Sequence, residues 1–232
     1  MTIRKYTFLR RRAGLSPEGF RDAWRGRYVG GAAADLAPVA SAFVHNEVLP
    51  QVPDLMPEPI WDGVEETVMK ADAVSLEAIR DNPLHRFGPG LADFVDPDQI
   101  VQFFAEDKVV IDGPARGICI LSLPRRRPGL SPAEFSRHYR NVHGELVTQV
   151  GAFTTNCNRY VQHHILPHTV KATGGFLPYE GISEFWFDSL DHAKAAWGAP
   201  EYMEKLRADE KNFVGSPPSH RVLVVPAPVA LG

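Results

Sequence analysis

The 232-residue chain has little cysteine and no long apolar run. Its two cysteines, Cys119 and Cys157, are too few for a disulfide framework and too far apart for a C-x-x-C pair. No stretch approaches the roughly 20 consecutive apolar residues that span a bilayer. The segment from Met1 to Arg12 lacks the apolar centre of a secretory signal. These absences predict a protein of the reducing cytoplasm that has no membrane partner.

An excess of basic residues is also lacking. The net charge is −3 and the isoelectric point is about 6.3, which argues against nucleic acid as a partner. The sequence contains no glycine-rich dinucleotide-binding motif and no P-loop motif. The pairs Gly113-Pro114 and Gly174-Gly175 are typical of turns. Composition is that of an ordinary globular protein, with 44% hydrophobic residues.

What the sequence does contain is a phrase that occurs twice. Residues 10–20 read R-R-R-A-G-L-S-P-E-G-F, and residues 125–135 read R-R-R-P-G-L-S-P-A-E-F. Further matches follow in the same order, pairing 43–50 with 160–167, 61–66 with 179–184, and 93–95 with 212–214. The units are much longer than a solenoid repeat of about 20–50 residues. The pattern therefore predicts a tandem duplication of a compact module.

Each half carries the same series of expected elements. Apolar runs predict first strands at 6–9 and 118–123. Ser16-Pro17 and Ser131-Pro132 are typical of helix starts, with serine as N-cap and proline in the first helical position. Later strands are expected near 43–49, 63–69 and 100–106, and near 159–166, 182–187 and 220–225, with second helices opening at Ser75 and Ser189.

The resulting order, β-α-β-β-α-β, is that of a ferredoxin-like unit. Its antiparallel sheet carries helices on one face, so the other face needs a cover. The predicted fold class is therefore α+β, with two tandem ferredoxin-like modules packed sheet to sheet. We expect the first module at 1–106, a linker at 107–116 and the second module at 117–232.

Three segments of the second half belong together as a set: 125–147, R-R-R-P-G-L-S-P-A-E-F-S-R-H-Y-R-N-V-H-G-E-L-V; 159–164, R-Y-V-Q-H-H; and 180–189, E-G-I-S-E-F-W-F-D-S. With them the sequence resembles the EthD-domain family, more strongly in the second half than in the first. The resemblance implies a dimeric α/β barrel, here formed within one chain. It also implies relatives among polyketide-modifying dehydratases, cyclases and cofactor-free monooxygenases, which is a range of reactions and not one reaction.

The catalytic candidates are His143, His164 and Tyr139. His143 lies one turn after Tyr139 at a helix end, where it could act as a general acid or base or interact with the last helix carbonyls. His163 and His164 are neighbours on a strand, so their side chains point to opposite faces. Because Tyr160 and Gln162 share the face of His164, that histidine is the predicted pocket residue, and Tyr139 is expected to position the substrate.

Nine further side chains are predicted to bind substrate: His163, Tyr160, Gln162, Glu184, Trp186, Trp24, Tyr28, His45 and Asn46. Core packing is the alternative role of the aromatic ones, and a solvent-facing strand position is the alternative for Glu184. The first half has Tyr28 in place of His143 and Asn46 in place of His163. We therefore expect the working site in the second half.

Neither a metal nor a cofactor is predicted. His143, His163, His164 and His168 lie close in sequence, but H-H-x-x-x-H is not a zinc pattern and neighbouring strand residues diverge. The arginine runs 10–12 and 125–127 could hold a phosphate or carboxylate, and solvated basic turns are the alternative.

The leading functional prediction is a cofactor-independent lyase of the dehydratase type. It would act by proton transfer on a small aromatic or polyketide-like molecule through a histidine of the second half. The alternatives are a cofactor-free monooxygenase of an activated phenol and a non-catalytic binding or accessory protein of a catabolic pathway. Association of the fused chain into homo-oligomers stays open.

Overall fold

The computed structural model describes residues 2–28, 34, 36–50, 52, 55–56, 59–72, 93–166, 169–172, 179–215 and 220–231. The helix expected from Ser75 and the metal candidate His168 lie outside these residues, as does the side chain of Tyr28. None of the helices in the described ranges is long and apolar enough to cross a membrane.

The two halves of the chain follow parallel courses. The first half contains β1 (Ile3–Arg11), α1 (Pro17–Ala23), the π-helical η1 (Trp24–Tyr28), β2 (Ala40–Val48), β3 (Gly63–Met69) and β4 (Val95–Ile111). The second half contains β5 (Ile118–Leu123), α4 (Pro132–His138), η3 (Tyr139–His143), α5 (Gly144–Thr148), α6 (Gly151–Asn156), β6 (Cys157–Ile165), β7 (Lys171–Ala172), β8 (Gly181–Phe187), α7 (Leu190–Gly198), η4 (Tyr202–Leu206), α8 (Arg207–Phe213) and β9 (His220–Val229).

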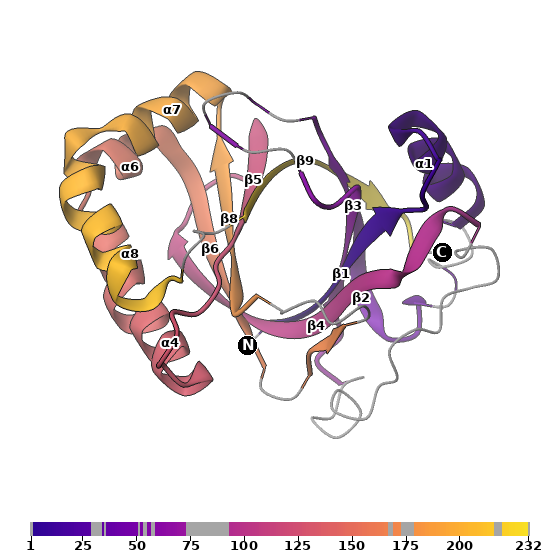
Figure 1. Ribbon diagram of the computed structural model, residues 1–232, viewed down its shortest axis with the longest axis horizontal. Helices are drawn as coiled ribbons and strands as arrows, with labels where there is room; N and C mark the ends of the chain where they lie inside the picture. Colours follow the sequence, from indigo (N-terminus) through magenta and orange to yellow (C-terminus); the bar gives the residue numbers. More distant parts are fainter. Residues whose placement is uncertain are drawn as a thin grey trace.

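The strands form one closed antiparallel barrel. Their order is β1-β3-β2-β9-β5-β8-β6-β4, and pairing of β1 with β4 closes the ring. Helices α4 to α8 cover the outside of the second half, and α1 lies outside the first half (Figure 1). The α+β class and the barrel are thus confirmed. The β-α-β-β-α-β order of the first half stays a prediction, because its second helix falls outside the described residues.

Two long strands join the halves. Strand β4 pairs with β1 through 95–106 and then with β6 through 105–111. Strand β9 pairs with β5 through 220–224 and then with β2 through 224–229. The two sheets are therefore continuous at their edges. The sequence had instead suggested two separate sheets packed face to face. Residues 107–111 of the expected linker are strand, because they cover the otherwise open edge of β6.

The repeated phrase builds the same turn twice. Ser16 accepts a hydrogen bond from the Gly19 amide at 3.0 Å. Ser131 and Glu134 form a complete capping box, so both predicted helix starts are confirmed. A second contact occurs in both halves, where an aromatic side chain packs against a strand glycine, Gly63 or Gly181. A Cβ atom at Gly63 would lie 2.6 Å from Trp24, and one at Gly181 would lie 3.0 Å from Tyr139. Glycine thus lets each helix lay an aromatic ring against its third strand.

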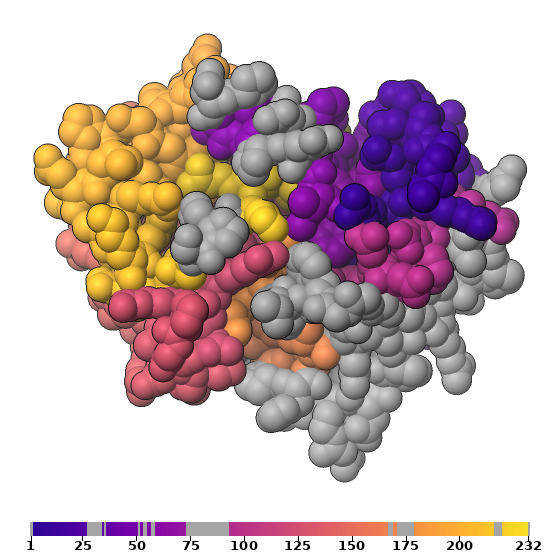
Figure 2. Space-filling view, viewed as in Figure 1, coloured from indigo at the N-terminus to yellow at the C-terminus, as the bar shows by residue number. Residues whose placement is uncertain are grey.

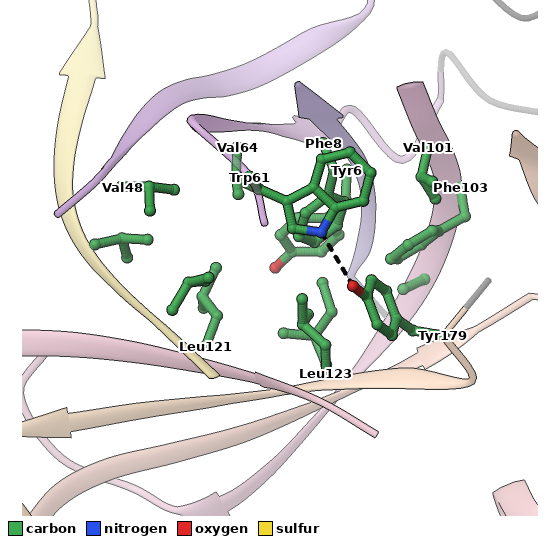
Figure 3. Packing of buried hydrophobic residues seen from close by; sticks show 14 of the residues in the cluster. Tyr6, Phe8, Val48, Trp61, Val64, Val101, Phe103, Leu121, Leu123 and Tyr179 are labelled. Atoms are coloured by element: carbon green, nitrogen blue, oxygen red, sulfur yellow. Dashed lines mark hydrogen bonds between the residues drawn. The ribbon is translucent and has the colours of Figure 1, made fainter. Parts of the chain in front are cut away.

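The barrel interior is largely aromatic and aliphatic. Strand alternation turns Tyr6, Phe8 and Phe103 inward, where they pack with Leu121 and Ile182. Across one part of this core the indole of Trp61 donates a hydrogen bond to the hydroxyl of Tyr179 at 3.0 Å (Figure 3). These two residues match in the repeat, so equivalent side chains of the two halves meet inside the barrel.

The interior also holds a buried ionic network. His163 is fully buried and bonds Asp107 through Nδ1 at 2.8 Å and Glu184 through Nε2 at 3.1 Å. Arg4 bonds Asp107 at 2.8 Å and also pairs with Glu66. Burial lowers the pKa of His163, but the hydrogen bonds and charges of its two carboxylates outweigh burial and raise it to about 9. The imidazolium therefore links strands from both halves.

This network should make stability depend on pH. The pKa of His163 is raised from 6.5 to about 9, so its stabilising contribution is complete below pH 6.5 and is lost as the pH rises through about 9. We expect the free energy of unfolding in urea to fall across this interval. His163→Gln should be less stable, by about 3–5 kcal/mol, because it leaves buried carboxylates unpaired.

The control is His192→Gln, since His192 is exposed and lies outside the barrel interior. It should keep the wild-type pH dependence. If His163→Gln does not fold, an NMR titration of the wild-type histidines gives the same information. A His163 resonance that titrates near pH 6.5 would contradict the assignment.

A second expectation concerns the repeated glycine. Gly63→Ala should destabilise the protein by about 1–3 kcal/mol, because the new methyl group meets the Trp24 ring. For a chain of this size that corresponds to a melting temperature lower by roughly 2–12 °C. Gly26→Ala is the matched control, since nothing lies within 4 Å of a Cβ atom there. Equal melting temperatures for the two variants would contradict the packing role.

Candidate functional site

The helix-facing side of the second half gathers the polar residues that the sequence singled out. On β6, the side chains of Tyr160, Gln162 and His164 point toward the helices, while His163 points into the barrel. The neighbouring histidines therefore face opposite sides of the sheet, as strand alternation predicted. Gly144 allows this approach, because a Cβ atom there would lie 3.1 Å from the Gln162 amide.

Tyr139 lies at the centre of a hydroxyl cluster. Its hydroxyl is 2.5 Å from Ser183 Oγ and donates to the Ile182 carbonyl at 3.1 Å. The Tyr160 hydroxyl is 3.4 Å from the same serine and accepts a bond from Gln162 at 3.0 Å. Burial raises the pKa of Tyr139 well above its usual value, so the phenol stays neutral and can serve as a hydrogen-bond donor.

His143 is held by a carboxylate. Its Nδ1 lies 3.0 Å from Asp209 Oδ2, and His138 Nε2 lies 2.8 Å from Asp209 Oδ1. Burial raises the pKa of Asp209, but hydrogen bonds from the two histidines outweigh burial and lower it. An ionised Asp209 fixes the proton of His143 on Nδ1 and leaves Nε2 as the basic nitrogen. The pair has the geometry of a general base with its orienting carboxylate.

His143 borders a small cavity between the sheet and the helices. The cavity measures about 30 Å³, close to the volume of one water molecule. Aromatic side chains form much of its wall, including Phe153, Phe185, Trp197, Tyr202 and Phe213. Besides His143, its polar groups come from Ser122, Tyr139, Ser183, Glu210 and Arg221. The site thus joins a base to an apolar, aromatic surface.

His164 stands behind Tyr139 and outside the lining of this cavity. Its ring centroid is 5.0 Å from that of Tyr139, and its nitrogens lie 3.4 Å from Ser136 Oγ and 3.2 Å from Gln162 Oε1. Burial and the nearby positive charges of Arg140 and Lys108 lower its pKa to about 3. His164 is therefore neutral and contacts the tyrosine that lines the cavity.

Four predicted binding residues lie away from His143, on the inner face of the barrel. His163 and Glu184 belong to the ionic network, and Trp186 donates to Glu184 at 2.6 Å. Asn46 lies 3.4 Å from Glu66. The structure does not bring these side chains to the helix-side site, because residues at odd spacing along a strand face opposite ways.

In the first half the corresponding space is filled. Trp24 stacks on His45 with centroids 4.1 Å apart and donates to Glu65 at 3.2 Å. Glu65 and Trp24 take the places of Ser183 and Tyr139. Burial raises the pKa of Glu65 to about 7 and lowers that of His45 to about 4. An indole packed on the strand replaces the hydroxyl cluster, which supports the predicted inequality of the halves.

Sequence reasoning missed Asp209, Ser183 and Arg4. Asp209 lies four residues before Phe213 on α8, so the two share a helix face, and the Phe213 ring is 5.0 Å from that of His143. The four-residue spacing between Asp209 and Phe213 was the sequence feature that could have pointed to Asp209. Within the described ranges, no group of three or more histidine, cysteine, aspartate or glutamate side chains could hold a metal ion.

Solved structures share this fold over nearly the whole chain. A candidate monooxygenase from Lactobacillus acidophilus NCFM is 12% identical, with a TM-score of 0.53, over 100% of this chain and 97% of its own. An anthrone oxidase-like protein is 13% identical, with a TM-score of 0.56, over 99% and 93%. A candidate monooxygenase from Fusobacterium nucleatum subsp. nucleatum ATCC 25586 is 10% identical, with a TM-score of 0.51, over 100% and 94%. At these identities the likeness shows the fold.

Among curated protein sequences, none matches this chain. The EthD domain profile, in contrast, matches residues 127–217. The match spans α4 to α8 and strands β6 and β8, and so includes both His143 and Asp209. The region of the second half that contains the candidate site is therefore similar to the EthD domain family.

Proposed function

We propose that the second half is a cofactor-independent active site that removes a proton from a small, apolar, aromatic or polyketide-like substrate. The observation that carries the proposal is the bond of His143 Nδ1 to Asp209 at 3.0 Å, beside a cavity walled by aromatic rings. A base oriented by a carboxylate is the usual arrangement for proton abstraction near neutral pH. An apolar wall excludes water and favours a flat ring.

The substrate would lie between His143 and the hydroxyl cluster. His143 Nε2 takes a proton from carbon or from a phenol, and the Tyr139 and Ser183 hydroxyls stabilise the negative charge that develops on oxygen. His164 does not touch the substrate in this scheme. It positions Tyr139 from behind, through ring contact and Gln162.

The cavity of about 30 Å³ is too small for such a substrate as it stands. Binding therefore requires the covering π-helix η4 to move outward, while α8 stays in place because it carries Asp209, the partner of His143. Tyr202 and Leu206 on η4 form part of the outer wall, so displacement of η4 enlarges the site and leaves both the barrel and the bond between Asp209 and His143 in place.

Reaction of the resulting anion with dioxygen is the favoured second step. Two of the structural relatives are described as monooxygenases and one as anthrone oxidase-like. For an anthrone, the deprotonated methylene carbon would transfer electrons to dioxygen, form a carbon–oxygen bond and lose water. One methylene and one dioxygen give one ketone and one water, so no further reductant is needed.

A lyase step is the second candidate. The same proton abstraction would be followed by loss of a hydroxyl group from the neighbouring carbon. The hydroxyl cluster of Tyr139, Tyr160 and Ser183 supports this alternative, because it could donate a proton to the departing oxygen.

The base is tested by substitution. With anthrone as the probe, His143→Gln should lower kcat by about 10²–10⁴-fold, the usual contribution of a general base. Asp209→Asn should lower it strongly as well, because the amide no longer fixes the Nδ1 proton. Turnover is followed by absorbance of the ketone, and circular dichroism checks the fold. His192→Gln, a change at an exposed histidine, should leave kcat unchanged. Full turnover by His143→Gln would rule out His143 as the base.

Dioxygen use separates the two candidate reactions. An oxygenase should consume one dioxygen per ketone formed in an oxygen electrode, carry isotope label from dioxygen into the product, and stop under nitrogen. A lyase acting on a β-hydroxy ketone probe should run equally well without oxygen and release water. A protein that binds both probes, as seen by a raised melting temperature, and converts neither would favour the accessory-protein alternative.

A further inference from the structure

A much larger cleft lies in the first half, where β1 leads into α1. It encloses about 850 Å³, within the range of small-molecule sites. Arg10, Arg11, Arg12 and Arg21 line it together with Asp62 and Asp96. None of the residues that line it lines the cavity at His143. In Figure 2 the indigo residues of this region lie beside the purple ones of β3 on one face of the molecule.

Four arginines and two aspartates line the cleft. Arg11 pairs with Asp62, and Arg21 pairs with Glu47 at 3.2 Å. Arg10 donates to the neutral amide oxygen of Gln99 at 2.7 Å. Arg12 is exposed, and no ion pair engages it within the described part of the chain. Among the residues that the structure describes, the guanidinium groups of Arg10 and Arg12 thus face the cleft without a carboxylate in an ion pair, in a chain whose net charge is −3.

In the second half, the three arginines of the same motif contact other groups of the protein. Arg125 lies over the Tyr179 ring at 5.9 Å, and Arg126 pairs with Glu180 at 2.9 Å. Arg127 donates to the Lys211 carbonyl at 3.3 Å. The backbone is held alike in both copies, since the amides of Arg12 and Arg127 donate to the carbonyls of Phe94 and Phe213. The difference therefore lies in the side chains of Arg10 and Arg12.

The rest of the cleft wall is apolar. Val48 and Leu49 contribute at the end of β2, and Ile60 and Trp61 contribute just before β3. Planar guanidinium groups bind carboxylates in a bidentate manner, and an apolar wall favours a ring. We propose that this cleft is a second binding site, one that takes a small aromatic carboxylate, with Arg10 and Arg12 on the carboxylate and the half-buried Leu49 and Ile60 against the ring.

The test uses the full chain and calorimetric titration with naphthoate. Naphthoate should bind, and affinity should fall as salt is raised, because exposed charges are screened. Naphthalenemethanol, which has the same ring without the charge, should bind at least about tenfold more weakly. Arg12→Gln and Arg10→Gln should each weaken naphthoate binding by about tenfold, the loss of a charge-assisted hydrogen bond.

Arg127→Gln is the matched control, because it removes the equivalent arginine of the second copy of the phrase. It should leave the affinity unchanged, and so should His143→Gln, which lies in the other cavity. The proposal is overturned if naphthoate does not bind at millimolar concentration, if the alcohol binds as tightly, or if Arg127→Gln weakens binding as much as Arg12→Gln. Loss of binding in His143→Gln alone would assign naphthoate to the helix-side site instead.

Discussion

The exchange of strands between the halves is the constraint on which the rest of the structure depends. Strand β4 leaves the sheet of the first half and completes that of the second, and β9 does the reverse. An isolated half would expose the edges of β2 and β6, with their unpaired amides and carbonyls. Closure removes these edges and encloses an interior in which polar groups must find partners. The ionic network around His163 meets that requirement with residues from both halves.

Closure also decides which side chains can take part in chemistry. The inward face of each strand is committed to the core, so a substrate can reach the outward face, beneath the helices. The neighbours His163 and His164 show the consequence. His163 is held between two carboxylates in the interior, whereas His164 is neutral and contacts the tyrosine of the candidate site. Adjacent positions in the sequence thus differ in charge, with His163 protonated and His164 neutral, and lie in different surroundings.

Much of the fold could be predicted from the sequence because its signals are local. The serine caps, the proline that follows each, and the apolar strand runs specify elements through contacts within a few residues. Alternation likewise placed Tyr160, Gln162 and His164 on one face. The crossing of β4 at 107–111 could not be found in this way, since it depends on an open edge of β6 far away in sequence. Asp209 was missed for the same reason, because its partner His143 lies on another helix.

The two halves share the same strand and helix arrangement around the repeated motif and differ in the side chains that pack there. Each places an aromatic residue over a strand glycine, Trp24 over Gly63 and Tyr139 over Gly181. In the first half the indole stacks on His45 and bonds a carboxyl group, which leaves its ring as packing. In the second half the smaller phenol bonds a serine hydroxyl and leaves room for a cavity beside His143. For the repeated arginine motif the relation is reversed. Its side chains contact other protein groups in the second half, whereas in the first half they line a cleft. The candidate base and the candidate anion site therefore lie in different halves of the barrel, each where the side chains of that half leave room for a ligand.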